Sequence, residues 1–187
     1  TNDTTPSYVF TTGEAGTITS SLSFTTPTSA TVGSNQTITF STLSEGTYSG
    51  KTLTVTDAYG NAASLTIPDF VIDTTPPVLS EVTAINTPTN DNTPSYVFTT
   101  NEAGAISSSN SLTGDVTAEV GNNTIIFDTL DDGTYDSVTV TVTDAAGNAS
   151  NSLSVTTFVV DTTAPTFTNS PDSVTVQCDA DTATSAL

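Results

Sequence analysis

One stretch of sequence occurs twice in this chain. Residues 1–16 read TNDTTPSYVFTTGEAG and residues 89–104 read TNDNTPSYVFTTNEAG, so fourteen of the sixteen positions are identical. The segment LTVTDAYGN at residues 53–61 likewise returns as VTVTDAAGN at residues 140–148. A spacing of about 88 residues is the size of an ordinary small domain. The repetition predicts a tandem array of small domains and disfavours a single catalytic site.

The composition excludes several classes of function. Twenty carboxylates stand against one basic residue, Lys51, and no histidine, which gives a formal net charge of −19. We expect no nucleic acid partner, because phosphate binding depends on Lys and Arg. Without histidine no Ser-His or Cys-His pair can form, so we expect no enzyme activity. The chain has no run of about 18 apolar residues, so we expect no membrane insertion.

The distribution of β-forming residues predicts an all-β fold. Short runs of Val, Ile, Thr, Tyr and Phe alternate with turn residues, and residues 137–143 alternate Val with Thr as a strand with one buried face does. Roughly seven short strands in each repeat predict tandem immunoglobulin-like β-sandwiches in an elongated array. In the second repeat we expect strands at residues 78–85, 95–100, 105–109, 124–128, 137–143 and 153–160.

Two tyrosines occupy equivalent places just before an expected strand. Tyr48 follows Glu-Gly-Thr, and Tyr135 follows Asp-Gly-Thr. This placement predicts either a tyrosine corner, in which the hydroxyl bonds to upstream backbone, or a half-buried strand tyrosine.

Segments containing proline mark the boundaries between repeats. Residues 73–77 read DTTPP and residues 161–165 read DTTAP, each between the last strand of one repeat and the first strand of the next. Unit 1 lacks a first strand of its own, so it must borrow one, leave an edge open or follow a missing piece. Because the chain opens within a repeat, we expect it to be a segment of a longer, processed protein. The expected divisions are unit 1 (residues 1–75), unit 2 (residues 76–163) and the start of a third module (residues 164–187).

Acidic residues recur in register in the loops of both units. Successive strands of an antiparallel sandwich reverse direction, so alternate loops lie at opposite poles of each unit. This places four carboxylates at the junction of the units: Asp3 and Asp73 from unit 1, and Glu102 and Asp144 from unit 2. The only basic residue, Lys51, is expected on a strand and not in these loops. The four negative charges would therefore repel one another unless a cation lies between them.

A hard cation would relieve this repulsion. Ca²⁺ takes about 6–8 oxygen ligands from carboxylates, carbonyls and Asn side chains, and these loops are rich in all three. The loops hold no histidine or cysteine, which argues against zinc or copper. We therefore predict a calcium ion that joins the linker residue Asp73 to unit 2 and makes a flexible string rigid. An ordinary solvated set of acidic loops is the alternative.

The motifs TNDNTPSYVFTTNEAG, DDGTY, VTDAAGN and DTTAP, in that order, resemble the bacterial Ig-like repeats of giant cell-surface adhesins. The resemblance covers nearly all of residues 1–165. It implies extracellular extender modules with calcium at the interdomain junctions and neighbouring repeats as partners. An adhesive region elsewhere would bind a cell-surface or substratum ligand. By this match Asp3, Asp73, Glu102 and Asp144 would hold calcium at the complete junction, Asp91 and Asp161 would serve the next one, and Glu14 and Asp57 would face a preceding unit.

The end of the chain resembles a second module type. Residues 165–181 are similar to the opening of a HYR-type Ig-like module, which is common in very large surface proteins of Bacteroidota. In such a module Cys178 would pair with a later cysteine, whereas a buried free thiol is the alternative. Together the two module types resemble long surface adhesins of that phylum, including the type IX-secreted adhesins used in gliding motility.

The same fold leaves a second function open. Flat faces rich in Thr can bind sugars or ordered water, and the units would then act directly in adhesion as carbohydrate- or surface-binding modules. Thr is also simply a good β-former on an exposed face. A regular array of Thr on one flat sheet would favour binding, and an irregular array would favour plain extension.

Overall fold

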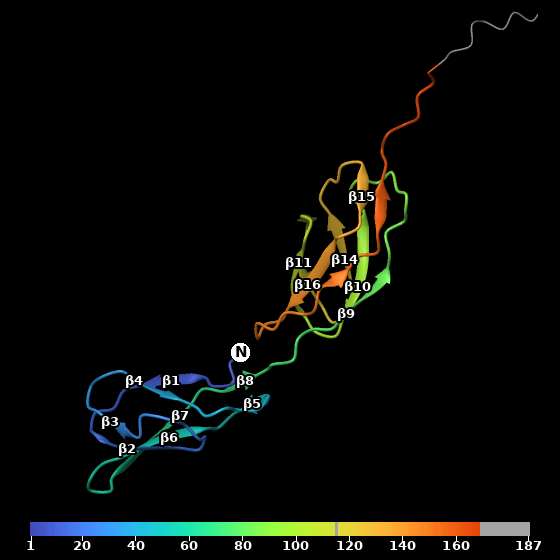
Figure 1. Ribbon diagram of the computed structural model, residues 1–187. Helices are drawn as coiled ribbons and strands as arrows, with labels where there is room; N and C mark the ends of the chain where they lie inside the picture. Colours follow the sequence, from blue (N-terminus) through green and yellow to red (C-terminus); the bar gives the residue numbers. More distant parts are fainter. Residues whose placement is uncertain (115, 169–187) are drawn as a thin grey trace, which may run out of the picture.

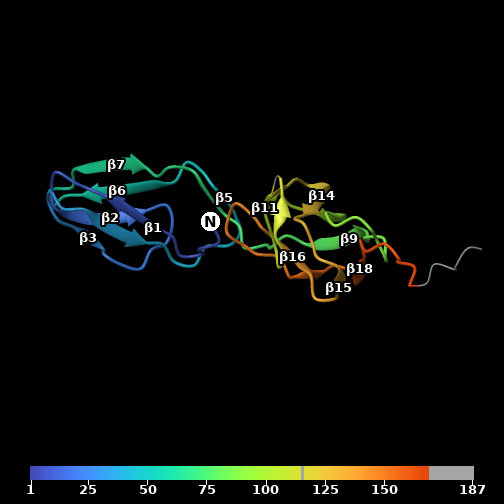
Figure 2. The same ribbon diagram turned by 90° about the horizontal axis from the view of Figure 1, so that it is seen from above.

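The computed structural model describes residues 1–114 and 116–168. These residues form two β-sandwiches, one for each sequence repeat, that follow each other end to end (Figure 1). Figure 2 shows the same arrangement from above. Within the described ranges there is no helix, and thus none that is long and apolar enough to cross a membrane. The prediction of an all-β fold is confirmed.

Unit 2 contains two antiparallel sheets of four strands each. The first sheet has the order β12-β14-β10-β9 and the second has the order β13-β11-β16-β17, while β15 and β18 form a separate pair. The bounds are β9 (Leu79–Thr83), β10 (Ser95–Thr100), β11 (Gly104–Ser108), β12 (Leu112–Thr113), β13 (Thr117–Ala118), β14 (Gly121–Phe127), β15 (Gly133–Tyr135), β16 (Thr139–Thr143), β17 (Leu153–Ser154) and β18 (Phe158–Val160). Phe98 of the first sheet and Val140 of the second share one buried core, so the sheets pack face to face.

Unit 1 repeats this plan with one sheet reduced. Its second sheet has four strands in the order β3-β2-β6-β7 and β5 pairs with β8, but its first sheet consists only of β1 and β4. The bounds are β1 (Ser7–Phe10), β2 (Gly16–Ser20), β3 (Ser29–Ala30), β4 (Gln36–Thr39), β5 (Gly46–Tyr48), β6 (Thr52–Thr56), β7 (Ala62–Thr66) and β8 (Phe70–Ile72). No described strand pairs with the outer edge of β1. Which of the three expected alternatives applies to unit 1 stays a prediction.

Most expected strands of unit 2 lie where the sequence placed them, and one differs. Residues 153–160 were expected to form a single strand, but they divide into β17, which pairs with β16, and β18, which pairs with β15. The chain changes partner at Val155 and Thr156, where the Val155 N–H donates to the Val138 carbonyl and the Thr156 N–H donates to Glu81. The hydrogen bond to Glu81 takes Thr156 out of the ladder and lets the chain cross between sheets.

Both tyrosines before the expected strands form tyrosine corners. The Tyr48 hydroxyl donates to the Ser44 carbonyl (2.8 Å), and the Tyr135 hydroxyl donates to the Asp131 carbonyl (2.9 Å). Each ring also stacks on a phenylalanine, Phe70 in unit 1 and Phe158 in unit 2. Of the two alternatives, the tyrosine corner is therefore confirmed.

Each unit has its own hydrophobic core. The core of unit 1 draws on residues from Phe10 to Ile72, and the core of unit 2 draws on residues from Ile85 to Val160. Residues 73–78 connect the two units without a strand. Residues 169–187, which hold Cys178 and most of the expected third module, lie outside the described residues.

Candidate functional site

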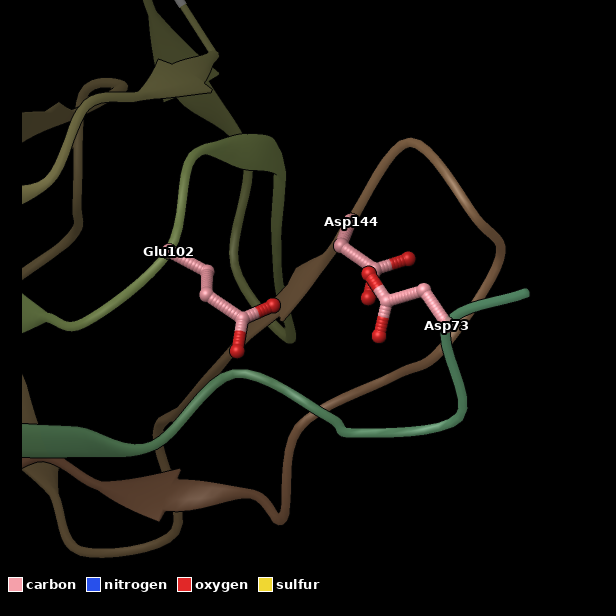
Figure 3. A group of neighbouring side chains, drawn as sticks. All are labelled: Asp73, Glu102 and Asp144. Atoms are coloured by element: carbon pink, nitrogen blue, oxygen red, sulfur yellow. The ribbon is translucent and has the colours of Figure 1, made fainter. Parts of the chain in front are cut away.

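Three carboxylates from three separate segments meet where the units join. Asp73 directly follows β8, Glu102 lies in the loop between β10 and β11, and Asp144 directly follows β16. All three are half-buried, and each offers an oxygen within 4.8 Å of the other two. Figure 3 shows the carboxylates gathered in the space between these three segments. In the part of the chain that the structure describes, no other three acidic, histidine or cysteine side chains come together in this way.

The repeated turn sequence Asp-Ala-x-Gly-Asn positions Asp144. Its Oδ1 accepts hydrogen bonds from the N–H groups of Gly147 (2.7 Å) and Asn148 (2.8 Å), and its Oδ2 accepts one from the Asn148 side chain (2.8 Å). Gly147 has a φ of 99°, a left-handed conformation that favours glycine. In unit 1 the carboxylate of Asp57 accepts equivalent bonds from Asn61. The motif is therefore first of all a turn former that fixes one carboxylate at the pole of each unit.

Glu102 is positioned by its neighbours in the Thr-x-Glu-Ala-Gly segment. Thr100, which is 3 % exposed, donates its hydroxyl to the Glu102 carbonyl (2.9 Å) and accepts the Glu102 N–H (3.3 Å). Two residues later, a Cβ on Gly104 would collide with the backbone carbonyl of Thr143. The glycine therefore permits a close approach of β11 to β16. This approach brings the Glu102 loop beside Asp144.

Asp73 connects the group to unit 1. Its N–H donates to the carbonyl of Thr1 (3.0 Å), and its Oδ1 accepts the N–H of Thr75 (3.1 Å). The first contact ties the end of β8 to the start of the chain, and the second forms the turn into the linker. The Asp73 carboxylate is thereby held at the pole that faces unit 2.

The charges in this group act on one another. Burial raises the pKa of Glu102, and the negative charges of Asp73, Asp144 and Glu45 raise it further. Burial also raises the pKa of Asp144, but hydrogen bonds from Asn148, Gly147 and Ala146 outweigh that effect and bring its pKa below the ordinary value. Of the three carboxylates, Glu102 is therefore the one whose pKa is raised by the neighbouring negative charges.

The spacing of the three carboxylates suits a large divalent cation. A Ca–O bond is about 2.4 Å long, so two oxygens on one calcium ion can lie up to about 4.8 Å apart. The group in the structure meets that limit. Lys51, the only Lys or Arg of the chain, lies just before β6 and is not part of the group. These residues could hold a calcium ion, with further oxygens coming from backbone or water.

The fourth carboxylate expected at this junction, Asp3, lies outside the group. Its Oδ1 accepts hydrogen bonds from the N–H (2.8 Å) and the hydroxyl (3.1 Å) of Thr5, which form a local turn. Asp91 makes the same two bonds to Thr93 in unit 2 (2.9 and 3.1 Å). This turn accounts for the repeated Asn-Asp-x-Thr sequence without a metal.

The other predicted ligands stand in pairs or alone. Glu14 and Asp57 line a common hollow of about 250 Å³ in unit 1, together with Asn61. Asp161 accepts the N–H of Thr163 (3.1 Å), as Asp73 does with Thr75. Among the described residues, none of these belongs to a group of three possible ligands.

Two asparagines that were not among the predicted site residues join the units directly. The Asn148 side chain donates to the carbonyl of Asp73 (2.9 Å), and the N–H of Asn2 donates to the carbonyl of Ala146 (3.1 Å). Both asparagines belong to repeated motifs, and this recurrence is the feature of the sequence that could have identified them. Their role at the junction depends on which loop atoms face the neighbouring unit, and the sequence does not specify that.

Another pair of carboxylates holds the linkers. Glu45 accepts hydrogen bonds from Thr74 and Thr75, and Asp132 accepts equivalent bonds from Thr162 and Thr163. Hydrogen bonds from Thr75 and then Thr74 lower the pKa of Glu45. Hydrogen bonds from Thr163 and then Thr162 likewise lower the pKa of Asp132. In each unit, a carboxylate thus holds the first residues of the following linker through hydrogen bonds.

Two models of protein families match the chain. Residues 80–162 match a bacterial Ig-like domain, and residues 34–111 match a bacterial Ig-like domain of group 3. The first match covers nearly all of unit 2, and the second runs from unit 1 across the linker into unit 2. No curated protein matches the chain.

The matches and the two-sheet architecture together define the class of protein. Both units are immunoglobulin-like β-sandwiches, and the two matched segments are similar to bacterial Ig-like domains. Domains of this kind are typically structural or adhesive modules, not enzymes, and they are common in extracellular or surface proteins. The matches therefore indicate a repeat role in a bacterial surface protein.

Proposed function

We propose that units 1 and 2 are extender repeats of a long cell-surface adhesin, made rigid by calcium at their junction. The observation that carries the proposal is the group of Asp73, Glu102 and Asp144, in which a carboxylate from the end of unit 1 lies beside carboxylates from two loops of unit 2. Neighbouring repeats of the same protein are the proposed partners. A separate adhesive region, held away from the cell by the repeats, would bind the cell-surface or substratum ligand.

The chemistry of the group supports calcium over other ions. Its donors are carboxylate oxygens, which suit hard cations, and neither unit contains a histidine or a cysteine. The raised pKa of Glu102 arises from burial and from the charges around it. A cation among the carboxylates would remove this repulsion and favour their ionised forms.

Calcium would act on the freedom of the junction more than on either fold, because each unit has its own core. An ion bound to Asp73 and to the two loops of unit 2 would oppose bending at residues 73–78. In millimolar calcium, a site with a dissociation constant of about 10 µM would stabilise the joined state by roughly 2.7 kcal/mol. The net charge of −19 would keep the remaining surface from adhering to other copies.

Calorimetric titration of the whole chain with Ca²⁺ tests this proposal. We expect saturable binding that is lost in Glu102→Gln. Glu14→Gln is the matched control, because Glu14 occupies the equivalent position in unit 1 but belongs to no group of three among the described residues. Small-angle scattering should show a longer, stiffer particle with calcium and a more flexible one after chelation. Absence of saturable binding, or equal loss in both variants, would contradict the proposal.

A second candidate function is direct binding to a carbohydrate or another surface. It is favoured by rows of hydroxyl side chains across one sheet of each unit. Thr19, Thr54 and Ser64 lie side by side on β2, β6 and β7, and in unit 2 Ser107 lies opposite Thr141. Neighbouring hydroxyls partly satisfy one another, as in the Thr54–Ser64 (2.7 Å) and Ser107–Thr141 (2.9 Å) pairs, which reduces what they offer a ligand.

Retention of the chain on insoluble polysaccharide distinguishes the two functions. Direct binding predicts retention that Thr54→Lys abolishes and that chelation leaves unchanged. The extender function predicts no retention by these units alone. Thr157→Lys, which changes an exposed hydroxyl outside the rows, controls for the added charge.

A further inference from the structure

The linker between the units has a bonded backbone along its whole length. Every N–H group in residues 73–78 donates a hydrogen bond, and Pro76 and Pro77 have no N–H to donate. Unit 1 holds the beginning of the linker, since Glu45 accepts the N–H of Thr74 (3.3 Å). The two prolines also fix φ in the middle of the segment. The linker is therefore a structured connection and not a flexible tether.

Asn101 of unit 2 holds the other end of the linker. It lies in the loop between β10 and β11, and its Oδ1 accepts the N–H of Val78 (2.6 Å). The Val78 side chain is 66 % exposed, so apolar burial contributes little to holding this residue in place. The Nδ2 group of Asn101 donates to Oε1 of Glu102 (3.5 Å). One side chain thus connects the end of the linker to the loop that carries Glu102.

The position of Asn101 is one of the two at which the repeated sixteen-residue segments differ. Unit 1 has Gly13 where unit 2 has Asn101, while the surrounding residues TT and EAG are the same in both. Gly13 does not have a positive φ, so the backbone of this loop does not require glycine. The choice of residue at this position is therefore free to serve the contact with a linker.

We propose that Asn101 is the docking residue for the linker that leads into unit 2, and that the amino acid at this position of the repeat sets how firmly a linker and the following unit are joined. Asparagine supplies an acceptor for the last N–H of the linker, and glycine supplies none. Repeats of the two kinds would form joints of different stiffness within one array. This inference goes beyond the extender function, because the bond joins protein groups alone and requires no ion.

The exchange of the Val78 amide proton with water, measured by NMR on the whole chain in buffer with a chelator, tests the proposal. Asn101→Gly gives the loop the residue of unit 1, and Asn101→Ala removes the acceptor without the added freedom of glycine. We expect both variants to speed the exchange about fivefold, because the Val78 N–H loses its acceptor. Asn101→Asp keeps an oxygen acceptor and should keep the slow exchange, which separates the hydrogen bond from a general effect on the loop.

Asn92→Thr is the matched control, because it changes the other position at which the repeated segments differ. The backbone carbonyl of Asn92 accepts the N–H of Leu130 (2.8 Å), and the threonine at this place in unit 1 makes the equivalent bond, so the side chain is not needed. We expect no change in the exchange of Val78. Residual dipolar couplings should show a wider range of inter-unit orientations in Asn101→Ala than in Asn92→Thr or the unchanged chain.

Three outcomes would overturn the proposal. The first is unchanged exchange of Val78 in both Asn101→Gly and Asn101→Ala. The second is faster exchange in Asn101→Asp by the same factor, which would show that the acceptor oxygen is not what holds the linker. The third is an unchanged range of inter-unit orientations in Asn101→Ala. All these measurements are made without calcium, so a failure of the calcium proposal would leave the expected results as they are.

Discussion

Units 1 and 2 begin with nearly the same residues but bury them to different extents. Tyr96 is fully buried (0 % exposed), whereas its counterpart Tyr8 is only half-buried, and Val9 is 54 % exposed. The sequences around these residues are almost identical, so local sequence does not explain the difference. In unit 2 β10 lies between β9 and β14, while in unit 1 β1 has β4 alone. A single neighbouring strand therefore decides how much of this edge is core.

In the opposite sheet the central isoleucine is buried in both units. Ile18 pairs with Val55 across β2 and β6, and Ile106 pairs with Val142 across β11 and β16 in the same register. Ile18 is 3 % exposed and Ile106 is 7 % exposed. The neighbouring valine differs, because Val55 is half-buried whereas Val142 is fully buried (0 % exposed). The larger difference in burial thus lies beside β1, and the smaller one lies in the sheet that contains β2 and β6.

The largest test of this comparison removes the equivalent tyrosines. Tyr96→Ala should lower the free energy of unfolding of unit 2 by about 3–5 kcal/mol, because it opens a cavity in a closed core. Tyr8→Ala should cost unit 1 about 1–2 kcal/mol, because that side chain is already partly hydrated. Amide hydrogen exchange resolved by residue measures both values in one chain. Equal costs would mean that β9 does not set the burial of this edge.

Gly104 and its counterpart Gly16 test the second sheet, which each unit has in equivalent form. A Cβ on Gly104 would collide with the Thr143 carbonyl, and a Cβ on Gly16 would collide with the Thr56 carbonyl. Because both obstacles are backbone, each Gly→Ala variant should cost its own unit about 1–3 kcal/mol. Gly13→Ala is the control, since an added Cβ there meets nothing. A clear difference between the first two costs would show that the second sheets are not equivalent.

The hydrogen bonds of Glu81 belong to unit 2 alone. Glu81→Gln should lower the free energy of unfolding of unit 2 by about 1–3 kcal/mol at neutral pH, because bonds to a charged acceptor are lost. Unit 1 should be unaffected. Urea unfolding followed by unit-specific amide signals measures the effect, and the exposed Glu119→Gln is the matched control. A loss of stability in the control of similar size would point to net charge as the cause.

The same variant has a defined pH dependence. Burial raises the pKa of Glu81, but hydrogen bonds from Thr156 and Tyr96 outweigh it, so the pKa in the folded state lies below the ordinary value. A lowered pKa stabilises the fold above the unfolded pKa of about 4.3, and this contribution is lost as pH falls through the folded value. The difference between Glu81→Gln and the unchanged chain should therefore shrink below about pH 4. If the difference in stability stays constant down to pH 2, the substitution acts through the shape of the side chain and not through its charge.

Strand periodicity made much of this architecture predictable. The expected strand at residues 95–100 coincides with β10. The reversal of successive strands also brought Asp73, Glu102 and Asp144 to one junction. These inferences succeed because alternation and chain direction are properties of whole strands, which tertiary packing does not alter.

Details within loops could not be predicted in the same way. Asp3 lies in an expected junction loop, but its carboxylate bonds to Thr5, while the neighbouring Asn2 contacts unit 2 through its backbone. Side-chain direction in a loop depends on local hydrogen bonds that compete with distant ones. The division of residues 153–160 into β17 and β18 similarly depends on Glu81, which is distant in sequence. Sequence patterns locate the poles of such units better than they identify the atoms that meet there.

The smallest effect concerns the junction itself, where the two turns of sequence Asp-Ala-x-Gly-Asn have different neighbours. Asn61 and Asn148 both bond to the aspartate of their own turn, but Asn148 also donates to the Asp73 carbonyl across the junction. Asn148→Ala should therefore weaken the contact between the units by about 1 kcal/mol, whereas Asn61→Ala should weaken only its own turn.

Residual dipolar couplings of the whole chain measure this difference, because they report how freely the units reorient. In calcium-free buffer, Asn148→Ala should broaden the distribution of inter-unit angles, and Asn61→Ala should leave it unchanged. Adding calcium should restore much of the order in Asn148→Ala, since the three carboxylates remain in place. If the variant is as ordered as the unchanged chain without calcium, the Asn148 contact does not constrain the junction. If calcium fails to restore order while still binding, Asn148 is needed to bring Asp73 to the ion.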